Sequence, residues 1–321
     1  MIKYIFKRIA LLLVALFSIT TIAFMLIRAL PMSPPEGANA AEEEAIREVW
    51  EARGYNKPLP VQYGIYLRDI VTRLDFGTSW KIKTAAPAGE LLAERLLPTV
   101  LVNLYSFIIA VPIGIALGIL AAVKKNKWQD HLISTGVMLF VSVPSFILGF
   151  LVQYILFFKL GIFPATVSSL ADAGGSWFSF AMLKSMIPPV LALSFGEIAG
   201  LSRFVRAELS ETLSSDYMLL ARAKGMSSLG ATMRHAFKNA MVPVLPMIIS
   251  GFIGILGGSL IIEEIFSIPG VGQLYVRSVT LRDYDVFMAD SIFYTFVTLA
   301  AGIAVDLSFG LIDPRIRMGE R

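Results

Sequence analysis

Long runs of apolar residues, rather than alternating apolar and polar positions, dominate this chain. A helix needs about 20 mostly apolar residues to cross the hydrocarbon layer of a membrane, because each residue rises about 1.5 Å and the layer is about 30 Å thick. The strands of a membrane barrel would instead alternate over about ten residues. The pattern predicts an all-α integral membrane protein with six spans. They lie at roughly 9–30, 99–123, 132–158, 186–201, 241–262 and 291–312.

The distribution of Lys and Arg predicts how these spans are oriented. Short loops rich in basic residues stay on the cytoplasmic side. The segments expected inside are 1–8, 124–131, 202–240 and 313–321. The short loops expected outside hold only Lys159, Lys184, Arg277 and Arg282. Both termini are therefore expected in the cytoplasm. The chain divides into an N-terminal transmembrane helix (1–30), an extracytoplasmic cap (31–95), a five-helix core (96–312) and a cytoplasmic tail (313–321).

The cap is expected to be folded. Residues 41–53 mix Glu and Arg at helical spacing around Ile46, Val49 and Trp50, and a second short helix is predicted at 62–74. The alternative that residues 1–30 form a cleaved secretory signal is disfavoured. The apolar run is too long for a signal, and the cleavage-like Ala38-Asn39-Ala40 lies well beyond it.

Composition agrees with a membrane protein. The 321 residues are 56% hydrophobic and 16% charged, with a mean hydropathy of +0.70, whereas soluble domains are about one quarter charged. Basic cytoplasmic loops account for the net charge of +4, so no nucleic-acid partner is expected. The absence of cysteine excludes disulfides and thiol chemistry. His131 and His235 are far apart in sequence, and no metal site is expected.

The inner loop 202–240 is the most informative segment. Residues 210–224 contain no Gly or Pro and predict one continuous helix, which Gly225 ends. A short amphipathic helix is predicted after it, because apolar residues recur at steps of three and four. These residues are Met226, Leu229, Met233, Phe237 and Ala240. Such a helix could dock into a groove of a partner or lie flat on lipid, and the residues alone leave both readings open.

The stretch from Gly225 to Thr232 fits the phosphate-loop pattern G-x-x-x-x-G-K-[ST], except that Ala231 replaces the lysine. A phosphate loop follows a strand and uses that lysine on the phosphates. A helix is predicted before Gly225, so we expect no nucleotide site. Gly225 is instead expected to let two helices meet at a sharp angle, and Gly230 to let another surface come close.

At this loop the chain resembles a known family. Residues 216–225 (DYMLLARAKG), followed by 235–243 (HAFKNAMVP), resemble the cytoplasmic "EAA" loop of binding-protein-dependent ABC import permeases, in the version of the oligopeptide/dipeptide/nickel branch. The start, with Arg28 and Leu30-Pro31, resembles the "B" permease subunit of dipeptide and oligopeptide systems. Other stretches resemble recurring family segments. They are Leu74–Ser79, Ser142–Phe146, Phe266–Gly272, Arg282-Asp283-Tyr284 and Asp313-Pro314-Arg315.

Two departures concern the outer surface. Met32-Ser33-Pro34 stands where the family usually has Gly-Asp-Pro, and Asp285 stands where a proline is common. The resemblance nevertheless implies a six-helix type I importer permease with the MetI-like fold and no catalytic residue. It also implies that the ATPase couples through the inner loop. The residues that this assigns to coupling are Asp216, Tyr217, Ala221, Arg222, Ala223, Lys224, Gly225, Met226, Leu229, Gly230, Met233, His235 and Asn239.

The resemblance further implies the partners and the location. They are a second related permease forming a heterodimer, two ATPase subunits that bind ATP and magnesium in place of this chain, and an extracytoplasmic substrate-binding protein. The location is the cell (inner) membrane of a bacterium or archaeon, among lipid. Di- or oligopeptides are the expected substrates, with nickel chelates, glutathione and small glycans left open.

Two carboxylates inside predicted spans, Glu197 and Asp306, lead to an alternative. A charge facing lipid is costly, so both should face protein or water. They could line a substrate path and bind a peptide amine. They could also be structural, with Asp306 paired to a nearby base and Glu197 at a helix end within reach of Arg203. The alternative function is a stand-alone secondary transporter that uses both as ion carriers, although no internal repeat is evident.

Overall fold

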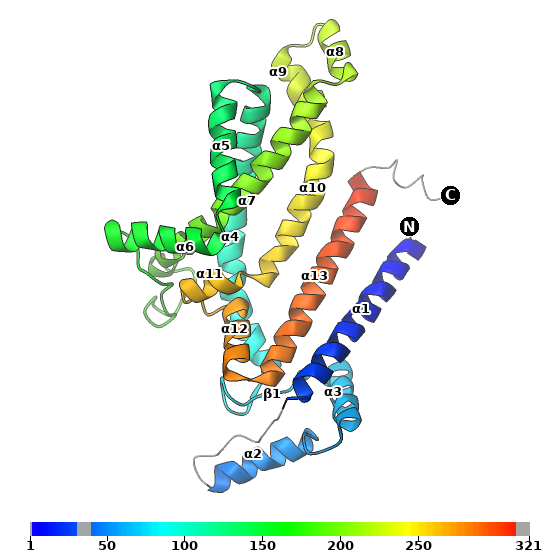
Figure 1. Ribbon diagram of the computed structural model, residues 1–321, viewed down its shortest axis with the longest axis vertical. Coiled ribbons are helices and arrows are strands. Elements are labelled where there is room, and N and C mark those ends of the chain that lie inside the picture. The colour runs from blue at the N-terminus through cyan, green and yellow to red at the C-terminus, as the bar shows by residue number, and fades with distance from the viewer. Residues whose placement is uncertain (1, 31–39, 313–321) are drawn as a thin grey trace.

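Long helices lie side by side along one axis of the computed structural model, which describes residues 2–30 and 40–312 (Figure 1). The helices are α1 (Ile2–Arg28), α2 (Ala40–Ala52), α3 (Leu59–Arg73), α4 (Ala88–Val123), α5 (Trp128–Ser142), α6 (Ser145–Gln153), α7 (Phe180–Leu213), α8 (Asp216–Ala223), α9 (Ser228–Ala231), α10 (Phe237–Gly254), α11 (Leu260–Ile265), α12 (Val271–Leu281) and α13 (Tyr284–Ile312). Three short helices of other types adjoin them: the π-helices η1 (Tyr154–Lys159) and η2 (Thr232–Ala236), and the 3-10 helix η3 (Ile255–Gly257). Strands β1 (Thr78–Ser79) and β2 (Ala86–Pro87) form one small antiparallel pair.

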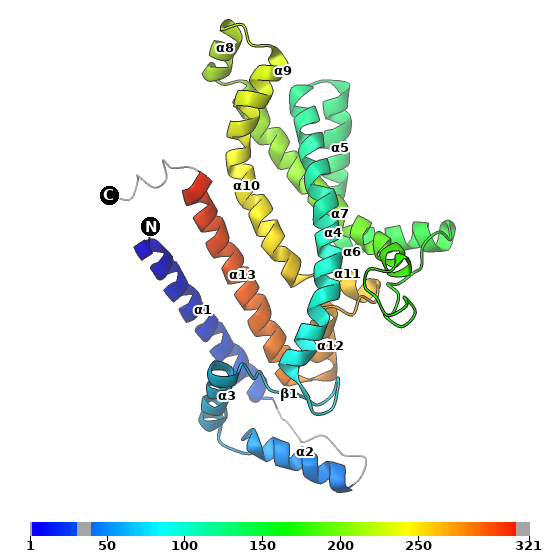
Figure 2. The ribbon, with the colours of Figure 1, turned by 180° about the vertical axis from the view of Figure 1, so that it is seen from behind.

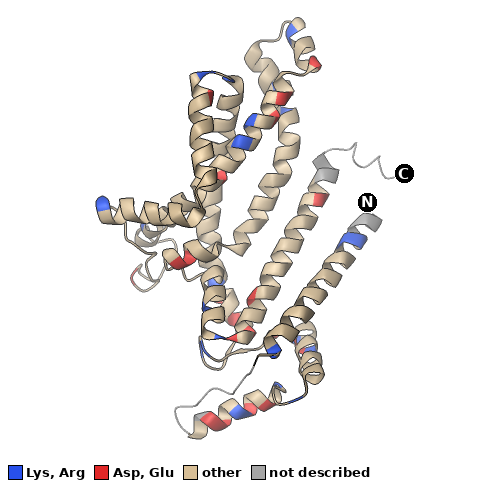
Figure 3. Ribbon diagram, in the orientation of Figure 1, with Lys and Arg blue, Asp and Glu red and all other residues tan. Residues whose placement is uncertain are grey.

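The predicted Met32-Ser33-Pro34 departure, the Ala38-Asn39 part of the cleavage-like stretch, the Asp313-Pro314-Arg315 segment and the tail 313–321 lie outside the described residues. Within the described part, five helices are long and apolar enough to cross a membrane. They comprise residues 6–28, 88–123, 180–213, 228–257 and 284–308. A sixth span exists only if α5 and the α6–η1 segment count together. Most charged positions lie on the helix ends and on the two extremities of the molecule (Figure 3).

The third predicted span, 132–158, is wrong as a single helix. The chain bends by 100° between α5 and the α6–η1 segment, and α6 projects sideways from the bundle (Figure 1). The bend lies at Val143 and Pro144. Proline has no N–H to donate and disfavours helical backbone in the residue before it. Val143 accordingly has extended dihedrals, φ −87° and ψ 124°. An unbroken apolar run therefore conceals two helices of different direction.

The fourth span is longer than predicted. Helix α7 has 34 residues and continues through Pro188 and Pro189, far beyond the expected 186–201. Its start is capped by Ser179, whose hydroxyl accepts a hydrogen bond from the Met182 N–H. Glu197 consequently lies in the middle of a helix, and its predicted position at a helix end is wrong.

Helices α4 and α7 form the most extensive contact in the bundle (Figure 2). Two glycines of α4, one turn apart, allow their backbones to approach closely. A Cβ added at Gly118 would lie 2.8 Å from the carbonyl oxygen of Ser202 and 2.6 Å from Cβ of Val205. A Cβ at Gly114 would lie 3.2 Å from the carbonyl oxygen of Ile198. This pair forms the rigid centre on which the two extremities are built.

One extremity is the cap, formed by α2, α3 and the β1–β2 hairpin (Figure 1). Both predicted cap helices are present, and the buried Ile46, Trp50 and Trp80 hold α2 against the hairpin. Helix α4 begins at Ala88, ahead of the predicted boundary at residue 95. The extracytoplasmic location of the cap remains a prediction.

Candidate functional site

The opposite extremity is a protruding segment, residues 214–236, which we name the tip (Figure 1). It contains α8, α9 and η2, and joins the end of α7 to the start of α10. The expected helix 210–224 is wrong, because α7 ends at Leu213 and α8 begins only at Asp216. The amphipathic helix predicted after Gly225 is also not separate, since it continues through η2 directly into α10. The tip is therefore continuous with two long helices of the bundle.

The turn at Gly225 has a definite geometry. Its φ of +83° is left-handed, its N–H donates to the Arg222 carbonyl, and the Met226 N–H donates to the Ala221 carbonyl. These two bonds define a Schellman motif, in which glycine is the usual residue. The prediction that Gly225 joins two helices sharply is confirmed. Helices lie on both sides of the turn, so the near-match to a phosphate loop reflects helix termination.

Gly230 belongs to the cap of the next helix. Its N–H donates to the Ser227 hydroxyl at 3.1 Å, which caps the start of α9. A Cβ added at Gly230 would lie 3.0 Å from that oxygen. The expectation that Gly230 admits another surface remains a prediction.

The tip has a small core of its own. Leu209 from α7 and Met218 from α8 are fully buried, and they pack against a cluster of alanines. The alanines are Ala122, Ala221, Ala231, Ala236 and Ala240. Small residues let the end of α7, α8 and the start of α10 approach closely. The tip is therefore a packed unit, continuous with the bundle.

The predicted coupling residues lie together in the tip and the first turn of α10, mostly on its surface. Among them, Ala221 is buried, while Met226, Gly230 and His235 are half-buried. The exposed members are Asp216, Tyr217, Arg222, Ala223, Lys224, Gly225, Leu229, Met233 and Asn239.

Two large residues of the predicted apolar stripe are exposed, as a helix that docks on a partner or on lipid requires. Leu229 is 73% exposed and Met233 is 48% exposed, although both were expected to share one face with Ala240, which is buried. The face turned to the protein consists of small residues instead. Leu229 and Met233 therefore point away from the tip core, whereas Met226 packs against it.

Two exposed residues were missed. Leu219 is 63% exposed and Leu220 is 57% exposed, both on α8. With Tyr217, Leu229 and Met233 they form an exposed apolar surface on the tip, which we name the tip surface. Adjacent residues of a helix point in different directions. The Leu219-Leu220 pair was therefore the sequence signal for an exposed apolar residue in this short helix.

Glu197 is exposed on this chain and borders a pocket. Its carboxylate accepts a hydrogen bond from the Ser106 hydroxyl at 3.2 Å, and it lines a pocket between α4, α7 and α10. The other lining residues include Phe107 and Met247. No contact with Arg203 is formed among the described residues.

Asp306 has a basic partner. Its carboxylate lies 2.9 Å from the Arg8 guanidinium, joining α13 to α1 at their tip-side ends. The expectation that Asp306 could pair with a nearby base is confirmed. This pair is partly exposed, so its contribution to stability is small.

The departure at Asp285 is a buried structural feature, not a surface detail. Its carboxylate lies 2.7 Å from the Arg28 guanidinium of α1, and both side chains are almost completely buried. The Tyr55 hydroxyl and the Thr78 N–H also donate to it. Burial, and then the Asp285 charge, raise the pKa of Tyr55 well above its usual value, so this hydroxyl remains a donor. One carboxylate thereby joins α1, the cap and α13.

Two other family-like stretches also hold loops in place. Asp283 accepts hydrogen bonds from the Ser79 hydroxyl and from the N–H groups of residues 80–82, fixing the hairpin. Glu263 accepts from the Thr99 hydroxyl and the Gln273 N–H at the start of α12. It is only 2% exposed, whereas Glu264 is exposed. A carboxylate is favourable at a helix N-terminus.

Comparison with known families agrees with this architecture. The model described as "Binding-protein-dependent transport system inner membrane component" matches residues 114–318, and the model for the N-terminal membrane component of the same systems matches residues 1–88. The chain belongs to this family. Its members are permease subunits of ABC importers, which work with ATPase and substrate-binding partners, so it is a multi-pass component of the inner membrane. The alternative of a stand-alone secondary transporter is not supported.

Relatives cover the whole chain. The dipeptide transport system permease protein DppB of Lactococcus lactis is 36% identical over 99% of this chain and 100% of its own length. The Bacillus subtilis protein of the same name is 33% identical over 100% of both. The glutathione transport system permease protein GsiC of Escherichia coli is 34% identical over 99% of each.

Solved structures share the fold. A chain of the inward-facing MetNI methionine ABC transporter has a TM-score of 0.51, at 17% identity, over 68% of this chain and 97% of its own. A chain of an amino acid ABC transporter crystallised with histidines has a TM-score of 0.50, at 19% identity, over 69% and 94%. The MetI-like fold predicted from the sequence is confirmed.

Proposed function

We propose that this chain is the first permease subunit of an ATP-driven importer of di- or oligopeptides, and that an ATPase subunit docks on its tip surface. The tip surface carries this proposal. Five large apolar or aromatic side chains are exposed on a packed, protruding unit. Exposed apolar residues gathered on one projection are typical of an interaction site.

Charge supports a protein partner. Arg222, Lys224 and Arg234 are exposed around the tip surface, and Asp216 lies at the start of α8. An apolar centre with a charged rim is the usual composition of a protein interface. Lipid is the alternative for an amphipathic helix, but Tyr217, Leu219 and Leu220 lie on α8, outside the helices that are long and apolar enough to cross a membrane.

The route for coupling follows from packing. Met218 of α8 contacts a core shared by the end of α7 and the start of α10. When the ATPase subunits close, the tip carries both helices as one rigid body. A second, related permease supplies the other half of the path. ATP and magnesium are bound by the ATPase subunits, and this chain performs no catalysis.

For the substrate, di- and oligopeptides are proposed because the full-length relatives are named for dipeptide and glutathione transport. Glu197 is proposed to line the path, since it faces a pocket between three spans. A carboxylate there could interact with a peptide amine as it passes. Asp306 is proposed to be structural because its carboxylate forms an ion pair with Arg8. An external binding protein delivers the peptide.

The test is affinity purification of the tagged chain, co-expressed with its partner subunits, in mild detergent. The variant Leu219→Asp/Leu220→Asp places two charges on the tip surface. We expect the ATPase subunits to be lost while the second permease is retained. The matched control, Val61→Asp/Val71→Asp, alters two exposed apolar residues of the cap helix α3 and should keep both partners. Equal ATPase recovery from both variants would reject tip docking.

A further inference from the structure

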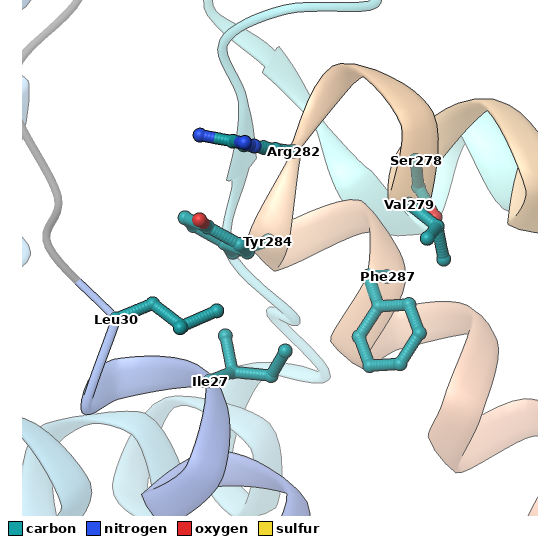
Figure 4. A pocket seen from close by; sticks show the side chains of 7 residues that line it. All are labelled: Ile27, Leu30, Ser278, Val279, Arg282, Tyr284 and Phe287. Carbon is teal, nitrogen blue, oxygen red and sulfur yellow. The ribbon is translucent and has the colours of Figure 1, made fainter.

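A pocket of about 410 Å³ opens at the cap end of the bundle, between α1 and the turn that joins α12 to α13 (Figure 4). Its apolar lining comes from Ile27 and Leu30 of the α1 end, Val279 of α12 and Phe287 of α13. Ser278, Arg282 and Tyr284 complete it. The Arg282 guanidinium and the Tyr284 hydroxyl extend to the same side (Figure 4). One face of the pocket is thus polar and cationic, and the remainder is apolar.

Arg282 holds an unusual backbone position. Its φ of +57° is left-handed, its N–H donates to the Val279 carbonyl, and the Asp283 N–H donates to the Ser278 carbonyl. This is the terminal position of a Schellman motif, where glycine is the usual residue because it has no Cβ. Leu74 ends α3 in the same left-handed conformation, so what distinguishes Arg282 is its charge and its place at the pocket. Within residues 2–30 and 40–312, that side chain forms no ion pair or hydrogen bond.

The pocket lies at the boundary of the membrane. The apolar span of α1 ends at Arg28 and that of α13 begins at Tyr284, so both reach their polar limit beside it. Exposed apolar residues continue from its rim along both sides, Leu26 on α1 and Leu281 on α12. Arginine and tyrosine at such a level typically contact lipid headgroups.

We propose that this pocket binds a phospholipid of the cap-side leaflet. The phosphate would be held by Arg282 and Tyr284, and an acyl chain would lie over Ile27 and Phe287. Arginine suits a phosphate because its planar fork offers several donors. The proposal does not depend on the transported substrate. A bound lipid here would fill the space between α1 and the α12–α13 turn, next to the buried Arg28–Asp285 pair.

The test uses the complete transporter, purified with its partner subunits and titrated with phosphatidylglycerol in native mass spectrometry. Arg282→Gly removes the side chain and relieves the left-handed backbone, so the fold is retained. We expect its affinity for phosphatidylglycerol to fall about five-fold, the usual effect of one basic residue at a membrane surface. Arg277→Gln, an exposed arginine on the same helix that does not line the pocket, should leave affinity unchanged.

Two further arms distinguish the source of the phosphate. Diacylglycerol, which lacks the phosphate, should bind equally to the wild type and Arg282→Gly. Inorganic phosphate in excess should not displace the lipid. The proposal is overturned if Arg282→Gly retains wild-type affinity for phosphatidylglycerol. Complete displacement by inorganic phosphate would also overturn it, because the site would then bind a free anion.

Discussion

Neutralising Asp285 should destabilise the protein substantially. The Arg28 and Asp285 side chains are 4% and 2% exposed and lie 2.7 Å apart. Removing one partner from a buried ion pair costs about 3–5 kcal/mol, because the other charge is left in a medium of low dielectric. Asparagine retains an oxygen that can accept from the Thr78 N–H, which lies 3.0 Å from the carboxylate. We therefore expect Asp285→Asn to cost about 3 kcal/mol, at the lower end of that range.

A double replacement separates the charge from the packing. Arg28→Met/Asp285→Leu removes both charges and fills the space with apolar groups, so it should recover most of the lost stability. The Arg28 guanidinium also lies 4.2 Å from the centre of the Tyr55 ring. Loss of that cation–π contact, worth about 1 kcal/mol or more when buried, would make recovery incomplete.

The assay is equilibrium unfolding in mixed detergent micelles, followed by tryptophan fluorescence. Trp50 and Trp80 are buried in the cap with ring centres 6.1 Å apart, so they report the region that Asp285 joins to α1. Glu51→Gln is the control, because the Arg47–Glu51 pair is exposed and should contribute less than about 0.5 kcal/mol. A cost below about 1 kcal/mol for Asp285→Asn, or a double variant no more stable than the single one, would refute the reasoning.

Three further predictions concern the bundle, each measured by thermal unfolding in detergent. Gly118→Leu should lower stability by about 3 kcal/mol or more, because the added side chain meets Val205 of α7. Gly136→Leu, where an added Cβ meets nothing within 4 Å, is the control, and equal losses would reject close packing as the cause. Asp130→Asn should cost about 2 kcal/mol, since Arg206 binds that carboxylate through two bonds of 2.5 and 2.8 Å but remains one-third exposed. An unchanged melting temperature would show that water replaces the pair. Asp290→Asn should raise stability by about 1–3 kcal/mol, because this fully buried carboxylate accepts no hydrogen bond among the described residues. A loss of stability would show that its charge is compensated.

Apolar runs located the spans because the membrane requires long apolar helices, but they carry no information about direction. The run at 132–158 remains apolar through Pro144, so its 100° bend left hydropathy unchanged. In the tip, the short apolar pattern correctly indicated an exposed apolar face at Leu229 and Met233, but it placed Ala240 on the same face, and Ala240 is buried in the tip core.

Contacts between residues far apart in the sequence were the other feature that the sequence could not predict. Asp285 was interpreted as a surface departure because its partners, Arg28, Tyr55 and Thr78, lie more than 200 positions away. The local signals succeeded where one residue decides the backbone. Gly225 was correctly predicted to end a helix and turn the chain, because the left-handed residue that follows a helix is usually glycine.

The most direct test of the central claim is uptake of a radiolabelled dipeptide into proteoliposomes containing this chain, the second permease, the ATPase subunits and the binding protein. The account predicts uptake that requires ATP at the tip side of the membrane. It also predicts that Leu219→Asp/Leu220→Asp abolishes uptake, while Val61→Asp/Val71→Asp retains it. Uptake without ATP, driven by an ion gradient and unaffected by the tip variant, would contradict the account.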